Sequence, residues 1–255
     1  MRLRRKITLA FFGISSLVSL LLALVLYRFI EHKLEDDLRD RLDDLAHVGS
    51  HGFDIAAYKS LTARLGDLDD NAVSAVEHGA EYKTIYDQLR MIRGAQPDLI
   101  RFVYLLAPTD DPANPKFVVD ADVLELLGKI ARGDPVKPND AGEIEISHYN
   151  KPYDVSGIPL LAKALASCAR ELEPDVVHDA AFGVSSLSAY HPLRGSDGVP
   201  LKDAQGRCLG VLGVDILDTD MQAALSAARD LAIKISVAMI IVALLVSIVM
   251  GTLLT

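Results

Sequence analysis

Tryptophan is absent from the 255-residue sequence, and cysteine occurs only twice, at Cys168 and Cys208. The sequence also lacks four motifs of common active sites: G-x-S-x-G, a glycine-rich phosphate loop, H-E-x-x-H and C-x-x-C. No motif therefore indicates an enzyme. One cysteine pair can form a disulfide in an oxidising compartment, but we predict that both cysteines stay unpaired as small apolar side chains.

Acidic residues outnumber basic residues in the long middle segment of the chain. The whole chain carries a net charge of −9, and five basic residues lie outside residues 28–233: Arg2, Arg4, Arg5, Lys6 and Lys234. The middle segment therefore carries −9 − 5 = −14. This excess of acid argues against nucleic acid or an anionic lipid surface as a partner.

Two long runs contain no charged side chain. The first, Ile7 to Tyr27, has 21 residues, and the second, Ile235 to Leu254, has 20. A helix of 21 residues is about 31 Å long, enough to cross a bilayer core of about 30 Å. We therefore predict a cytoplasmic N-terminus (1–6), a transmembrane helix (7–28), an extracytoplasmic sensor domain (29–231) and a second transmembrane helix (232–254).

The N-terminal basic cluster sets the predicted orientation. Clustered Lys and Arg stay on the cytoplasmic side, so both termini should be cytoplasmic and the middle segment outside the inner (plasma) membrane. The apolar run is too long for the core of a cleaved signal peptide, which spans about 7–15 residues. No basic anchor follows the second span, and we expect an output domain beyond Thr255.

Helical periodicity dominates both ends of the middle segment. Apolar residues recur every three or four positions from Ile30 to Val48, so the first membrane helix should continue outward as an amphipathic helix. Spacing alone does not decide whether this stripe packs on its own domain or on a second subunit. Further helices are predicted at 72–93, 123–131, 159–171 and from Asp218 into the second span.

Strand-like segments rich in β-branched and aromatic residues lie between these helices. They are predicted at 99–107, 117–119, 143–147, 184–193 and 208–216. The last is almost entirely apolar and should lie in the middle of a sheet. Gly210 and Gly213 would allow another side chain to pack closely on that strand.

A few polar residues interrupt these apolar strands. A carboxylate among aliphatic side chains is costly unless it is paired, and Asp120 and Asp122 alternate so that both can face one way. We predict that such residues hold the amine or hydroxyl of a small ligand; the alternative is a structural hydrogen bond. The predicted ligand-binding set is Tyr104, Asp120, Asp122, Tyr153, Tyr190 and Asp215. His47 and His51 share a helix face but lack a third ligand, so we predict no metal site and no cofactor.

The order of these segments resembles a Cache domain, a PAS-like extracytoplasmic sensor module. The matching segments are IRFVYLLAP, KFVVDAD, PYDVSGIPLLAKAL, DAAFGVSSLSAYHPLRGSDG and GRCLGVLGVDI. The resemblance covers roughly residues 30–230, although the loop after Gly195 is longer than usual. It implies an α+β fold, namely a single Cache domain with a central antiparallel sheet and a long N-terminal helix.

The resemblance also implies a function in signal transduction. Similar segments occur in membrane-bound histidine kinases, diguanylate cyclases and adenylate cyclases, usually with a HAMP domain after the second span. We therefore predict the non-enzymatic input region of a homodimeric receptor that passes a stimulus into its second membrane helix. The alternatives are a two-pass scaffold protein and a tethered periplasmic enzyme using Asp120 and Asp215 as acid and base.

Overall fold

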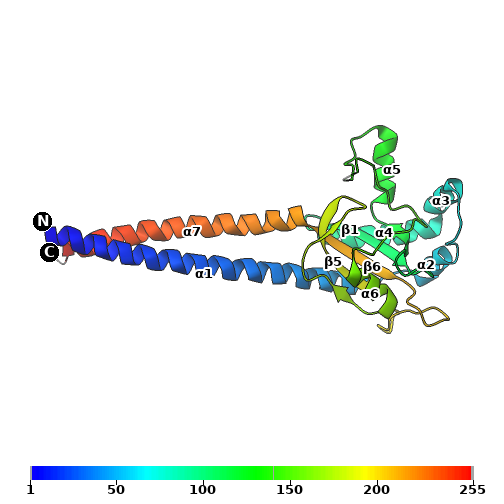
Figure 1. The fold of residues 1–255 in the computed structure, drawn as a ribbon, viewed down its shortest axis with the longest axis horizontal. Coiled ribbons are helices and arrows are strands. Elements are labelled where there is room, and N and C mark those ends of the chain that lie inside the picture. Colours follow the sequence, from blue (N-terminus) through cyan, green and yellow to red (C-terminus); the bar gives the residue numbers. More distant parts are fainter. Residues whose placement is uncertain (1, 140, 254–255) are drawn as a thin grey trace. The chain divides into compact units, whose positions relative to one another are not determined.

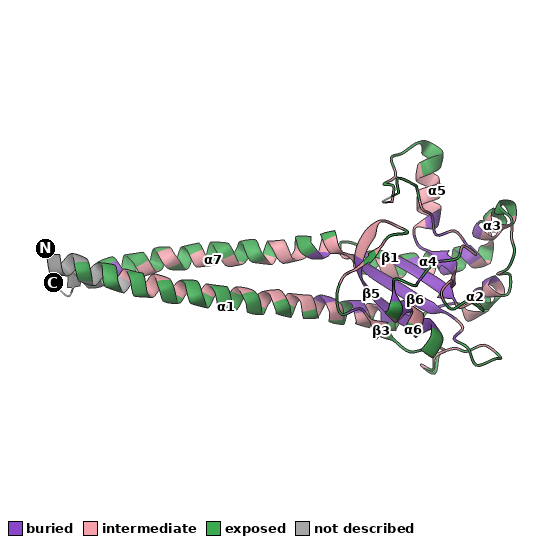
Figure 2. Ribbon diagram, in the orientation of Figure 1, coloured by how far each residue is buried: buried purple, intermediate pink, exposed green. Residues whose placement is uncertain are grey.

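The computed structural model describes residues 2–139 and 141–253, and the chain divides into two units. One unit contains residues Arg39–Met221, and the other contains the two chain ends, Met1–Leu38 and Gln222–Thr255. Figure 1 shows the order of the elements, and Figure 2 shows that burial concentrates in the strands. The α+β prediction is confirmed.

Two long helices occupy the chain ends. The helix α1 (Arg2–Gly49) includes both the first apolar run and the amphipathic segment after it, and α7 (Asp218–Leu253) includes the second run. Both contain a stretch long and apolar enough to cross a membrane, Phe12–Gly49 and Asp218–Val249. In these stretches the described leucine, isoleucine and valine side chains are largely exposed, as suits contact with lipid.

The final turns of α1 pack within the unit Arg39–Met221. Leu42 and Ala46 are completely buried there, so this part of the apolar stripe packs on its own domain. Val48, which the spacing placed on the same stripe, is 69% exposed. The buried stripe continues instead through Gly49, whose close neighbours are side-chain atoms of Ile92 and Leu212.

An antiparallel sheet forms the centre of this unit. Its strands are β1 (Ile100–Ala107), β2 (Lys116–Asp120), β3 (Glu171–Leu172), β4 (Val177–Asp179), β5 (Val184–Pro192) and β6 (Val211–Leu217). The strand order is β2-β1-β6-β5-β3, and β4 also pairs with β5. The last long strand, β6, therefore lies in the middle of the sheet, as its apolar composition predicted.

Helices α2 (Ile55–Thr62), α3 (Asp70–Glu77) and α4 (Ala80–Gly94) precede the sheet. The sequence did not predict α2, although Asp54 caps it by accepting a hydrogen bond from the Ala57 N–H at 3.0 Å. The prediction of one helix over 72–93 is wrong. Gly79 has an extended backbone with ψ 159° and separates α3 from α4.

Helices α5 (Val123–Arg132) and α6 (Pro159–Ser167) follow the first two strands. The helix α6 is shorter than predicted because Cys168 adopts a left-handed backbone, with φ 54°, and ends it. The predicted strand at 143–147 is absent from the described structure, where these residues form a loop without strand pairing. Ser147 in this loop instead donates a hydrogen bond to the Asp120 carboxylate.

Two tyrosines lie against the central strand where it has glycines. A Cβ at Gly210 would overlap the Tyr58 hydroxyl, and one at Gly213 would overlap the Tyr104 ring. The close packing predicted at these glycines is therefore present. The Tyr58 hydroxyl also lies 3.3 Å from the carbonyl oxygens of both Leu106 and Leu209 and donates to them, which ties α2 to β1 and to the segment just before β6.

The prediction that the cysteines stay unpaired is wrong. Cys168 and Cys208 form a disulfide with a Cα–Cα distance of 5.0 Å. The reason is topological: α6 ends at Cys168, on the face of the sheet that also holds Cys208 in one apolar cluster. Their separation of 40 residues hid this proximity in the sequence.

The disulfide should contribute measurably to stability. Closing a loop of 40 residues restricts the unfolded chain by about 4 kcal/mol in the loop-entropy description. We expect the C168S/C208S variant of the full chain to lose up to about that free energy of unfolding in a denaturant titration. Reductant should destabilise the natural protein and leave the variant unchanged, and an equal effect on both would contradict the assignment.

Candidate ligand-binding site

A cavity of about 330 Å³ lies on one face of the sheet within the unit Arg39–Met221. Strands β1, β2, β4, β5 and β6 contribute to its lining, together with α5 and the loops that follow β2. Its volume falls in the range of small-molecule sites. All six residues of the predicted ligand-binding set line it: Tyr104, Asp120, Asp122, Tyr153, Tyr190 and Asp215.

Asp215 occupies the central strand β6, opposite Ser188 of β5 and Phe102 of β1. Its side chain is buried, and its Oδ1 atom has no hydrogen-bond partner among the described residues. Burial raises the pKa of Asp215 to about 8, although the hydroxyls of Ser188 and Tyr104 act to lower it. An unsatisfied buried carboxylate oxygen is costly, and a bound donor would remove this cost.

Asp120 ends the edge strand β2, where it pairs with Tyr104 of β1. One carboxylate oxygen accepts the Asp122 backbone N–H at 2.7 Å, and the other accepts the Ser147 hydroxyl. Burial, followed by repulsion from Asp122, raises the pKa of Asp120. The side chain is therefore held in place by neutral donors and has no cationic partner within ion-pair distance among the described residues.

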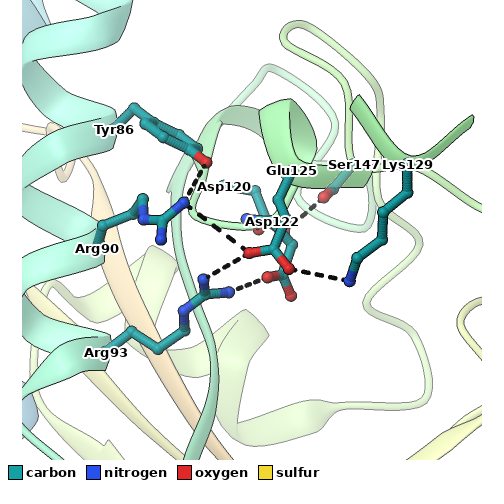
Figure 3. A network of polar contacts seen from close by, with 8 residues as sticks. All are labelled: Tyr86, Arg90, Arg93, Asp120, Asp122, Glu125, Lys129 and Ser147. Atoms are coloured by element: carbon teal, nitrogen blue, oxygen red, sulfur yellow. Dashed lines mark hydrogen bonds and ion pairs between the residues drawn. The ribbon is translucent and has the colours of Figure 1, made fainter. Parts of the chain in front are cut away.

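Asp122 differs from Asp120 because it belongs to an ion-pair network (Figure 3). The Arg93 guanidinium of α4 bonds Asp122 and also donates to Glu125 Oε2 at 3.0 Å. Lys129 binds the same Glu125 at 2.9 Å, and these bonds lower the pKa of Glu125 to about 2. The network attaches α5, which forms one wall of the cavity, to α4.

Aromatic rings separate the acidic groups. Phe117 lies between Tyr104 and Tyr153, with ring centroids 5.8 and 5.0 Å away, and Phe182 packs on both Phe117 and Tyr153. Burial raises the pKa values of Tyr104, Tyr153 and Tyr190, so these phenols remain protonated donors at neutral pH. Such a lining suits a ligand with an apolar body and polar ends.

Several lining residues were missed by the sequence prediction. Asp179 of β4 accepts a hydrogen bond from the Tyr153 hydroxyl at 2.6 Å, and Ser188 and Phe182 also line the cavity. Asp179 is the last residue of a strand of only three residues, which has no recognisable pattern in the sequence. Ser188 alternates with Tyr190 on β5, and this period of two was the one available signal.

The two histidines considered as metal ligands lie away from this cavity. His47 and His51 contact each other edge to face, with ring centroids 4.8 Å apart. In the described part of the chain, no group of three or more His, Cys, Asp or Glu side chains is arranged to hold a metal ion.

Comparisons with known proteins give structural likenesses only. No protein-family model and no curated protein matches the chain. Among solved structures, the chain aligns with the ligand-binding domain of the Campylobacter jejuni chemoreceptor Tlp3 in complex with L-valine. The identity is 13%, the alignment covers 77% of this chain and 66% of that chain, and the TM-score is 0.27.

A second alignment is to the ligand-binding domain of the Pseudomonas aeruginosa PAO1 amino acid chemoreceptor PctC in complex with GABA. The identity is 17%, the coverage is 74% of this chain and 68% of that chain, and the TM-score is 0.31. This chain thus spans about two thirds of each solved domain. Both of these solved structures are ligand-binding domains of chemoreceptors.

Removing Arg93 should destabilise the cavity wall. The side chains of Arg93 and Asp122 are only 17% and 15% exposed, so R93Q leaves a nearly buried carboxylate without its cation. We expect a loss of about 1–3 kcal/mol in the free energy of unfolding. The control is R90Q, because Arg90 lies 3.9 Å from Glu125 at the surface and should contribute under about 1 kcal/mol. Equal losses in both variants would contradict the role of Arg93.

The free protein should lose stability as pH rises from about 4 to 8. The pKa of Asp215 is near 8 in the folded state but about 3.9 in the unfolded chain, so the folded state binds more protons in this window. Thermal melting followed by tyrosine circular dichroism should show the decline, and D215N should flatten it. The control D175N removes a carboxylate that is 90% exposed; the same flattening there would contradict the assignment.

Proposed function

We propose that this chain is the input region of a two-pass transmembrane signalling receptor whose cavity binds a small organic molecule through a cationic nitrogen. The domain would lie outside the cytoplasmic membrane at about residues 29–231, with both termini inside. The output would be a kinase or cyclase domain, joined through a HAMP segment, in a homodimer. The N-terminal basic cluster supports the orientation.

The unsatisfied carboxylate of Asp215 carries the proposal. A buried acid with a free oxygen atom favours a ligand that brings a positive charge and N–H donors. The surrounding Tyr104, Tyr153 and Phe117 add aromatic faces, which also attract cationic nitrogen. Replacing the proton on Asp215 by an ammonium group exchanges one positive charge for another without burying a net negative charge.

The position of Asp215 in the chain supports a signalling role. It lies on β6, and α7 begins at Asp218, the residue after the strand. A ligand that moves β6 therefore acts directly on the start of the helix that contains the second apolar run. Transmission would require that the ligand bind one of two conformations of this junction more tightly.

Amine binding should strengthen with pH. Below a pKa of about 8, an ammonium ligand must displace the Asp215 proton, so its affinity should rise up to about tenfold per pH unit. Titration calorimetry on the full chain in lipid nanodiscs, with 1-aminobutane and amino acids as probes, should show this rise from pH 6 to 8. Buffers with different ionisation enthalpies should reveal the released proton.

Two variants make the binding test specific. D215N should abolish both amine binding and proton release, whereas D175N at the surface should leave both unchanged. Binding of anionic compounds alone, or amine affinity that is independent of both pH and Asp215, would refute the proposed ligand class.

A further inference from the structure

The cavity is lined by charges of both signs. Its cations Arg101 and Lys137 are exposed, and Lys129 pairs with Glu125. Among the acids that line it, Asp122 and Glu125 bind Arg93, and Glu145 binds Lys151. Asp120, Asp179 and Asp215 have no ion-pair partner among the described residues. Because Asp120 and Asp215 repel each other and are both buried, neutralising one still leaves the other at a cost.

Asp120 and Asp215 lie on strands that are separated by one strand in the sheet. Asp120 is on β2 and Asp215 is on β6, and β1 runs between these strands. Adjacent strands are about 4.8 Å apart, which separates the two backbone positions by roughly 10 Å across the sheet. Asp120 pairs with Tyr104 but Asp215 pairs with Phe102, so they are also offset by roughly 7 Å along the strands, and the total separation is roughly 12 Å. Asp179 lies near Asp215, because its charge raises the pKa of Asp215. The Oδ2 atom of Asp179 accepts a hydrogen bond from the Tyr153 hydroxyl.

An aromatic side chain, Tyr104, comes from the strand between those of Asp120 and Asp215. Tyr104 of β1 pairs with Asp120 on one side and with Gly213 on the other. Its ring lies on Gly213, where a Cβ would collide with it, and it contacts Phe117. From Asp120 to Asp215, the cavity lining therefore presents an acid, an aromatic ring and a second acid. This order fits a ligand with a chain of methylene groups and a positive charge at each end.

We infer that the preferred ligand is a dication with two amino groups on a short aliphatic spacer. This inference rests on the proposed function, since it assigns the ligand class to the same cavity. One ammonium would bind Asp215 near Asp179, and the other would bind Asp120. With ammonium–carboxylate contacts of about 2.8 Å, the nitrogens would be roughly 5–7 Å apart, the span of a four-carbon diamine.

The test compares matched probes on the full chain in lipid nanodiscs at pH 7.5. The probes are 1,4-diaminobutane, the monoamine 1-aminobutane and the zwitterion 4-aminobutanoate. We expect the diamine to bind at least thirtyfold more tightly than either of the others and to release more protons than the monoamine. The series from 1,3-diaminopropane to 1,6-diaminohexane should show an affinity maximum at an intermediate length.

Variants then assign each end of the ligand. D120N should reduce diamine affinity to the level of the monoamine, and its thermal melting should show that the variant is folded. D215N should abolish binding of both, and D175N should affect neither. If the monoamine or the zwitterion binds as tightly as the diamine, the two-cation inference is wrong and the proposed function stands. If none of these amines binds, the proposed function fails as well.

Discussion

A carboxylate in the middle of a buried sheet costs free energy unless it keeps a proton or gains a cation, and the cavity is built around this constraint. Asp215 sits on the central strand with one oxygen unsatisfied and a pKa raised to about 8. Its neighbour Gly213 has no side chain, so the Tyr104 ring fits beside it. Serine hydroxyls from β5 line the adjacent position. The cavity therefore stays polar at its floor although apolar side chains surround it.

The strand β5 connects this cavity to the end of α1. Ser188 and Tyr190 line the cavity, whereas His191, one residue further, is buried and bonds Asp43 of α1 at 2.7 Å. Asp43 also binds Arg170 at 3.0 Å. Alternation along a strand thus places ligand contacts and helix contacts on neighbouring residues. Closely packed interiors transmit small displacements. A shift of β5 would therefore strain the hydrogen bond between His191 and Asp43.

Sequence reasoning found those features whose signals are local. The apolar β6 strand, its glycines and its embedded Asp215 are contiguous, so their central position and close packing were predictable. The break at Gly79 was missed because helical periodicity continues on both sides of it. The disulfide and Asp179 were missed for a different reason. Both depend on segments brought together by the topology: Cys168 meets Cys208 across 40 residues, and β4 is too short to be recognised.

Asp120 and Asp122 show why pattern alone does not define a binding residue. Their alternate spacing predicted that both can face one way, and both line the cavity. Arg93 forms an ion pair with Asp122 and thereby attaches α5 to α4, whereas Asp120 accepts hydrogen bonds only from neutral donors. The difference is caused by Arg93 of α4, more than twenty residues earlier in the chain. Arg93 lies within ion-pair distance of Asp122 but not of Asp120. In the proposed site, an acid that the fold leaves without a cation can pair with a cationic ligand, and this criterion favours Asp120, Asp179 and Asp215 over Asp122.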